Sequence, residues 1–140
     1  SEIAKHCVIL RCAGLYGPGR IPRLADLQSE SPIPANPDVW LNLIHIDDAA
    51  DIVVQVASRP TPSPTYLVAD GQPVRRREFY QYLANLKGLP APQFVTPDGG
   101  ESGRRAGGDN KRINNQRLLS EIEPTLKFPS YREGLLAIET

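Results

Sequence analysis

Short, continuous apolar runs alternate along the chain with polar stretches that are rich in proline and glycine. The first run, residues 7–10, is rich in β-branched residues without alternation, which is typical of a strand covered on both faces in a parallel sheet. It leads into a small-residue turn at 12–20, and such turns at the carboxyl ends of parallel strands are where open α/β sheets bind ligands. Residues 40–46 and 66–69 are predicted to be further extended segments.

The remaining apolar positions recur at helical spacing. A buried helix is predicted after Asp47 and Asp48, because carboxylates at a helix start accept its free N–H groups and Pro60 stops the run. A second helix follows residues 75–77 and ends at Gly88. Shorter helices are expected in three further places: near residues 22–28, after Asn114 or Asn115, and after Ser130.

Only three strands are predicted, and three strands cannot form an independent parallel sheet that is covered on both faces. The pattern is therefore that of an α/β protein in which most strands are missing. The chain also opens on Ser1 rather than Met and soon enters an apolar run. We expect a piece of a longer protein, and we expect residues 1–140 alone to bury too little surface to be stable. Residues 96–109 hold five glycines and are expected to form a mobile loop.

Charge and composition exclude several classes of function. Sixteen basic and sixteen acidic residues give no net charge, so no global field gathers nucleic acid or anionic lipid. The basic cluster at 75–77 lacks interleaved aromatic residues, and we expect it to pair with Asp70 or Glu78 or to contact an anionic substrate. No apolar stretch approaches the ~20 residues of a membrane helix, and no leader peptide is evident. A cytoplasmic protein without nucleic-acid or membrane partners is expected.

The two cysteines, Cys7 and Cys12, are expected to be buried thiols in a reducing compartment. Their spacing on a strand directs the side chains to opposite faces, so a disulfide between them is not expected.

Five segments carry a resemblance to a known family. Residues 10–20 (Leu-Arg-x-x-Gly-x-Tyr-Gly-Pro-Gly-Arg), 42–50 (Asn-Leu-Ile-His-Ile-Asp-Asp-Ala-Ala) and 66–71 (Tyr-Leu-Val-Ala-Asp-Gly) occur in this order, followed by segments at 110–115 and 129–135. Together they resemble the carboxyl-terminal part of the NAD(P)-dependent epimerase/dehydratase-like proteins, the extended and atypical short-chain dehydrogenases/reductases. The resemblance implies an α/β fold: the last portion of a Rossmann-type parallel sheet with a small, mostly helical substrate domain.

Two hallmarks of that family do not occur in the chain: a Gly-x-x-Gly-x-x-Gly loop and a Tyr-x-x-x-Lys pair. The first lets backbone N–H groups approach a pyrophosphate, and the second carries the acid/base chemistry. In the family both precede the strand at residues 7–10, so we expect them in an N-terminal half of the fold that this sequence does not contain. No catalytic residue is therefore assigned here.

By family position, Ala13, Gly14, Leu15 and Tyr16 are expected to contact the nicotinamide end of a bound NAD or NADP. A turn that needs its glycines only for conformation is the alternative. Arg20 and His45 are assigned to the substrate side, although Arg20 could equally be a solvated surface residue. The position of His45 in the family favours structural support beside the substrate cleft over a catalytic role.

Asp47 and Asp48 are expected to be helix caps, and no metal site is predicted. Residues 1–60 are expected to form the last part of the dinucleotide-binding sheet with a substrate-cleft segment, and residues 61–140 the carboxyl-terminal substrate-side region.

The predicted function is that of an NAD(P)-dependent oxidoreductase, epimerase or dehydratase that acts on a small polar molecule by hydride transfer at a nicotinamide. Many nucleotide-sugar members carry Asn at the position of Gly14, and sugar epimerases often carry an arginine at the position of Leu41. Since leucine cannot grip a diphosphate as an arginine does, a nucleotide-sugar substrate is not favoured. The alternative is a non-catalytic NAD(P)-sensing regulator or interaction protein of the same fold. Homodimer formation is left open.

Overall fold

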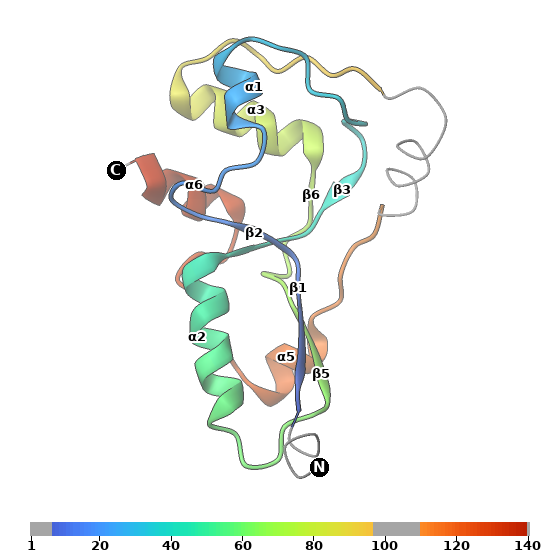
Figure 1. The fold of residues 1–140 in the computed structure, drawn as a ribbon, viewed down its shortest axis with the longest axis vertical. Coiled ribbons are helices and arrows are strands. Elements are labelled where there is room, and N and C mark those ends of the chain that lie inside the picture. The colour runs from blue at the N-terminus through green and yellow to red at the C-terminus, as the bar shows by residue number, and fades with distance from the viewer. Residues whose placement is uncertain (1–6, 97–109, 140) are drawn as a thin grey trace.

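The computed structural model describes residues 7–96 and 110–139 (Figure 1). Two groups of elements lie one above the other in Figure 1, joined by the strands that run between them. We call β1, β5, α2 and α5 the sheet region, and α1, α3 and α6 the helical region. Each region has its own cluster of buried apolar side chains.

The sheet region is built on two parallel strands. β1 (Ile9–Cys12) pairs in parallel with β5 (Thr65–Val68), with Leu10 opposite Tyr66. Helix α2 (Ile46–Ala57) covers one face of this pair and buries Ile52 and Val56 against it. The short helix α5 (Gln116–Glu121) packs beside β5 through Leu118.

A second parallel pair stands between the two regions. β2 (Gly14–Tyr16) runs beside β4 (Leu43–His45). Because side chains alternate along a strand, Ile44 belongs to the sheet-region cluster while Leu43 belongs to the helical-region cluster. Close by, β3 (Trp40–Leu41) pairs antiparallel with β6 (Val74–Arg75).

The helical region gathers α1 (Leu24–Gln28), α3 (Arg76–Lys87) and α6 (Tyr131–Glu139). Helix α3 buries Phe79 and Leu83, and α6 packs on it through Leu135. Gly88 ends α3 in the left-handed conformation at φ 65°, which a residue without a Cβ adopts at little cost. The Ser130 hydroxyl accepts from the Arg132 backbone N–H and so caps α6 as predicted.

The predicted α/β class is confirmed, and the predicted strands and helices occur within a few residues of their expected bounds. Two expectations need correction. Cys7 and Cys12 are exposed rather than buried. Within the described residues only one face of the β1–β5 pair is covered, so Ile9 remains 53% exposed. Of the two asparagines before α5, Asn114 accepts the backbone N–H of Gln116 through its Oδ1 at 2.9 Å, while Asn115 donates through its Nδ2 to the carbonyl of Ala69 at 2.9 Å. The predicted mobile loop lies largely outside the described residues.

Candidate functional site

The turn after β1 lies where two parallel strands end. The backbone N–H of Ala13 donates to the carbonyl of Val68, and that of Gly14 to the carbonyl of Asn42, both at 2.9 Å. These bonds hold the turn at the carboxyl ends of β1 and β5, the side of an open α/β sheet at which ligands bind. Ala13 and Leu15 are half-buried and Gly14 is exposed, so this segment presents bare backbone to solvent.

Tyr16 lies inside the protein. Its side chain is fully buried, and its hydroxyl donates to the carbonyl of Ser130 at 3.3 Å. Gly134 on α6 makes this position possible, because a Cβ there would come within 2.0 Å of the Tyr16 hydroxyl oxygen. Burial, together with the nearby carboxylates of Asp70 and Asp48, raises the pKa of Tyr16. The phenol is therefore a neutral packing group that locks the turn to α6.

Gly17 and Arg20 complete this turn. A Cβ on Gly17 would lie 2.6 Å from the side chain of Ile46, so the chain passes α2 at a distance that only glycine allows. The Nε of the exposed Arg20 donates to the carbonyl of Leu15 at 3.3 Å. Arg20 thus stabilises the turn from its exposed side, and the rest of its guanidinium stays at the surface.

His45 is the N-cap of α2. Its side chain is 2% exposed, and Nδ1 accepts the backbone N–H of Asp47 at 3.0 Å. The imidazole ring packs on Phe128, with 4.0 Å between ring centroids, and edge-on against Tyr16 at 5.3 Å. The expectation that Asp47 and Asp48 cap this helix is wrong, because His45 supplies the capping acceptor. These contacts support a structural role for His45.

Asp48 has a different function in the fold. Its side chain is almost fully buried, and its two carboxylate oxygens accept the backbone N–H groups of Lys127 and Phe128, at 2.8 and 3.0 Å. It therefore fixes the segment that carries Phe128 against His45. The exposed neighbour Asp47 makes no such contact and lies 4.0 Å from His45 Nδ1. Sequence spacing alone does not distinguish these two carboxylates.

Asp70, which the sequence suggested only as a partner for the basic cluster at 75–77, is a buried carboxyl. Its backbone N–H donates to the carbonyl of Leu43, and its Oδ1 accepts the backbone N–H of Gln72 at 2.8 Å. Its Oδ2 is buried and has no hydrogen-bond partner. Burial, reinforced by the carboxylates of Glu133 and Asp48, raises the pKa of Asp70 to about 7.

The three arginines at 75–77 bind the loop that carries Asn36 and Asp38. Arg75 donates to the carbonyl of Asp38, and Arg77 forms an ion pair with the Asp38 carboxylate at 2.8 Å. Arg76 donates to the carbonyl of Asn36 at 2.9 Å. The guanidinium of Arg75 also lies 4.1 Å from the ring centroid of Trp40. The expected pairing with Asp70 or Glu78 does not occur in these contacts.

Among the described residues, no group of three or more His, Cys, Asp or Glu side chains could hold a metal ion. None of the described helices is long and apolar enough to span a membrane.

Comparison with known proteins gives the family context of this geometry. No family model matches the chain. A structure described as an NAD-dependent epimerase/dehydratase from Methylobacillus flagellatus is 32% identical with a TM-score of 0.71, over 94% of this chain and 45% of its own. A conserved protein of unknown function from Silicibacter pomeroyi is 35% identical with a TM-score of 0.75, over 93% and 46%. The chain has an epimerase/dehydratase fold. The resemblance predicted from the five motifs is thereby confirmed.

Two further proteins are similar to this chain. Protein YeeZ of Escherichia coli K12 is 32% identical over 121 residues, which are 86% of this chain and 40% of YeeZ. The human epimerase family protein SDR39U1, solved with NADPH, shares the fold at 17% identity with a TM-score of 0.75, over 94% of this chain and 48% of its own. The chain therefore spans less than half the length of these proteins. The expected cofactor contacts at residues 13–16 and the substrate-side roles of Arg20 and His45 remain predictions.

Proposed function

We propose that the chain is the substrate-side part of an NAD(P)-dependent oxidoreductase, epimerase or dehydratase that acts on a small polar molecule by hydride transfer at a nicotinamide. The observation that carries this proposal is the exposed backbone around Gly14, held at the carboxyl ends of two parallel strands. The epimerase/dehydratase fold and the NAD dependence in the name of the Methylobacillus relative support it. The boundary near residue 60 and a cytoplasmic location belong to the same proposal.

The residues present fit one end of the cofactor. Gly14 is exposed, and Ala13 and Leu15 are half-buried beside it, so a flat ring could approach the backbone there. Tyr16 would support this surface from below, because its own side chain is enclosed by α6. The nicotinamide ring supplies the hydride when NAD(P) is bound, whereas a glycine-rich loop for the pyrophosphate must come from another part of the fold.

Proton transfer is also expected to come from elsewhere in the protein. Burial raises the pKa of Tyr16 and raises that of Tyr80 to about 12, so neither phenol is suited to acid/base work near neutral pH. His45 Nδ1 already accepts a backbone N–H, and its ring is packed between aromatic neighbours. The chain would thus shape the substrate side, with the tyrosine and lysine contributed by the dinucleotide-binding part.

Leu41 bears on the class of substrate. It packs against the helical-region core at the position where sugar epimerases often carry an arginine. A leucine in this place offers no charged group for a diphosphate, and Gly14 offers no side-chain amide. We propose that the substrate is a small polar molecule other than a nucleotide sugar.

The test is a fluorescence titration of the intact gene product with NADH and with NADPH. We expect saturable binding of at least one, and binding of neither would contradict the proposal. A Gly14→Val variant should weaken that binding by about 10-fold or more, because a Cβ at this position would lie 3.2 Å from both the Asn42 carbonyl oxygen and the Leu43 side chain, so a branched side chain would force the backbone of the turn to shift. Gly19→Ala is the matched control: it lies in the same turn, and a Cβ there meets nothing within 4 Å. It should bind the cofactor like the wild type, apart from a small loss of stability at its positive φ of 73°.

A further inference from the structure

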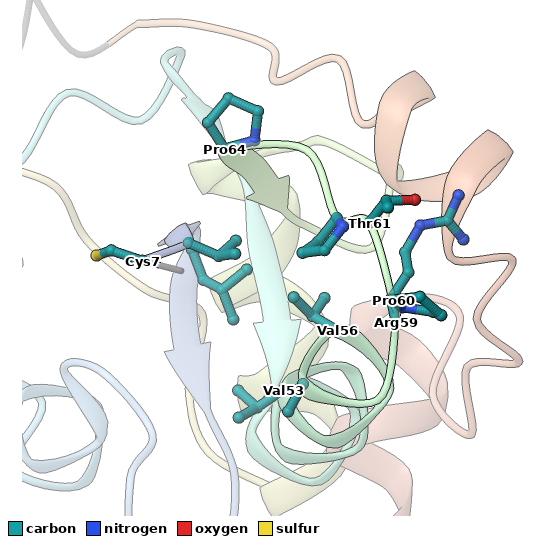
Figure 2. A pocket seen from close by; sticks show the side chains of 11 residues that line it. Cys7, Val53, Val56, Arg59, Pro60, Thr61 and Pro64 are labelled. Atoms are coloured by element: carbon teal, nitrogen blue, oxygen red, sulfur yellow. The ribbon is translucent and has the colours of Figure 1, made fainter. Parts of the chain in front are cut away.

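A hollow between β1 and α2 offers little to a charged ligand (Figure 2). It measures about 720 Å³ and is lined mainly by apolar side chains, such as those of Val8, Leu10 and Val53. The one charged residue of its lining is Arg59, whose guanidinium points away from the hollow and donates to the backbone carbonyl of Glu121. Unpaired charge is found elsewhere, beside β3.

Two guanidinium groups gather on one indole ring at β3. The guanidinium carbon of Arg75 lies 4.1 Å from the ring centroid of Trp40, and that of Arg112 lies 5.2 Å from it. Arg75 is the cross-strand partner of Trp40 in the β3–β6 pair, whereas Arg112 comes from a segment far along the chain. The face of an indole ring attracts cations, so the ring holds both arginines at one place despite their mutual repulsion.

The segment at 110–113 is fixed beside β3 by three hydrogen bonds (Figure 1). Asn110 Oδ1 accepts the backbone N–H of Trp40 at 2.9 Å. The side chain of Asn42 donates to the carbonyl of Lys111 at 2.5 Å and accepts the backbone N–H of Ile113 at 2.7 Å. The cationic side chains of this segment therefore start from a defined backbone.

The positive charge at this place is not neutralised within the part of the chain that the structure describes. No carboxylate there forms an ion pair with Arg75, Lys111 or Arg112. The carboxylate of Asp38 pairs with Arg77 at 2.8 Å, and Arg75 contacts only the Asp38 carbonyl. Lys111 and Arg112 are exposed, and Arg75 is half-buried. Three cations thus remain available beside one aromatic ring.

The donor groups indicate the kind of ligand. A guanidinium presents paired N–H groups that match two oxygens of a phosphate or a carboxylate, and an ammonium adds a point charge. We propose that Arg75, Lys111 and Arg112, gathered on Trp40, bind one phosphate or carboxylate group of a small molecule. The inference goes beyond the proposed function, because it requires neither a nicotinamide nor a transferred hydride.

The size and place of this site favour a small molecule over a polyanion. Nucleic-acid binding depends on many phosphate contacts, whereas these cations are gathered at a single ring in a chain without net charge. Asn42, which holds the segment at 110–113, also accepts the backbone N–H of Gly14 through its carbonyl at 2.9 Å. One asparagine therefore joins the anion site to the candidate cofactor turn.

A fluorescence titration of the intact gene product, without cofactor, tests the proposal. Trp40 is the single tryptophan of this chain, and the part of the signal that Trp40→Phe removes is its own. Inorganic phosphate and malonate are titrated separately, with sodium chloride keeping the ionic strength constant. We expect a saturable change in Trp40 emission with at least one of them, and the anion that binds more tightly identifies the group.

Arg112→Gln should weaken this binding by at least about 10-fold, because it removes a charge and a paired donor from the site. Arg132→Gln is the matched control and should bind the anion like the wild type. Arg132 also lies over aromatic rings, 5.2 Å from the centroid of Tyr82 and 5.4 Å from that of Tyr131, so the same charge and the same stacking are lost elsewhere.

Lys111→Gln is the second variant, should Arg112→Gln fail to fold. Asn42 contacts only the backbone of Lys111, so this change leaves the segment attached and should weaken binding several-fold. No saturable change with either anion would overturn the proposal. Binding as tight as in the wild type for Arg112→Gln, or equal weakening by Arg132→Gln, would also overturn it. Because cofactor is absent, a failure to bind NAD(P) leaves this result unchanged.

Discussion

The two regions of the molecule differ in how completely they enclose their cores. The helical region closes on itself: Tyr16, Phe79, Leu83 and Leu135 are at most 1% exposed and come from three separate elements. The sheet region is open. Five of the seven large hydrophobic residues that are exposed in the described structure belong to it: Ile9, Val53, Val54, Leu67 and Leu119.

The contrast shows which part of the fold this chain can complete. Helices α3 and α6 pack on each other and bury Phe79, Leu83 and Leu135 in one cluster. Within the part of the chain that the structure describes, strand β1 has a partner on one edge and cover on one face. The candidate site lies at the junction, where β2 leaves the open region and enters the closed one at Tyr16.

The largest effect is expected from Gly134→Ala, which tests whether α6 packs tightly over Tyr16 in the helical region. The added Cβ would lie 2.0 Å from the hydroxyl oxygen and 2.6 Å from ring carbons of Tyr16. Since Tyr16 is fully buried, the ring cannot move aside, and we expect a loss of at least about 3 kcal/mol in the free energy of unfolding. Urea denaturation of the intact gene product measures it.

If α6 does not enclose Tyr16, helix propensity predicts the opposite result for Gly134→Ala, a gain in stability. Alanine in place of glycine inside an unobstructed helix stabilises a protein by roughly 0.5–1 kcal/mol. A stabilised Gly134→Ala variant would therefore show that α6 does not enclose Tyr16. Leu136→Ala on the same helix, at a half-exposed position, controls for loss of contacts in α6 and should change stability much less.

The second largest effect distinguishes Asp48 from Asp47, the two adjacent carboxylates at the start of α2, by their contributions to stability. Asp48→Ala leaves the backbone N–H groups of Lys127 and Phe128 without their acceptors, and we expect it to cost about 2–3 kcal/mol of unfolding free energy. Asp47→Ala removes an exposed side chain and should change stability by less than about 0.5 kcal/mol. Equal effects in urea denaturation would mean that the junction does not depend on Asp48.

The smallest effect is a pH dependence that comes from Asp70. Burial raises its pKa from 3.8 to about 7, so the folded protein keeps this proton over a range in which the unfolded chain has released it. Stability from this group is therefore present below about pH 4 and is lost as the pH rises toward 7. Glu133 on α6 and Asp48 on α2 face it with the same charge, and they reinforce the loss.

Asp70→Asn removes the ionisation and keeps an oxygen for the backbone N–H of Gln72. Its stability relative to wild type should increase by roughly 1–2 kcal/mol between about pH 5 and pH 8. Asp51→Asn on the exposed side of α2 is the control and should show no such trend. Parallel stability curves for wild type and Asp70→Asn would show that Asp70 is ionised at neutral pH in the folded state.

Much of this architecture could be predicted from the sequence, because local signals carry it. The apolar runs placed the strands, Ser130 marked the start of α6, and Gly88 marked the end of α3. The missing information was tertiary. The difference between Asp47 and Asp48 depends on a segment about 80 residues away, and the burial of Tyr16 depends on a glycine in the last helix. The exposure of Cys7 and Cys12 depends on which elements cover β1, and the spacing of the two thiols does not encode this.

The central claim is that the open sheet region is one part of a larger parallel sheet. Backbone amide hydrogen exchange at β1 in the intact gene product tests it most directly. Arg11 and Ala13 point toward β5, whereas Leu10 and Cys12 point toward the free edge. The account predicts slow exchange at all four amides, since a further strand pairs with the second edge. Rapid exchange at Leu10 and Cys12 beside slow exchange at Arg11 and Ala13 would contradict it.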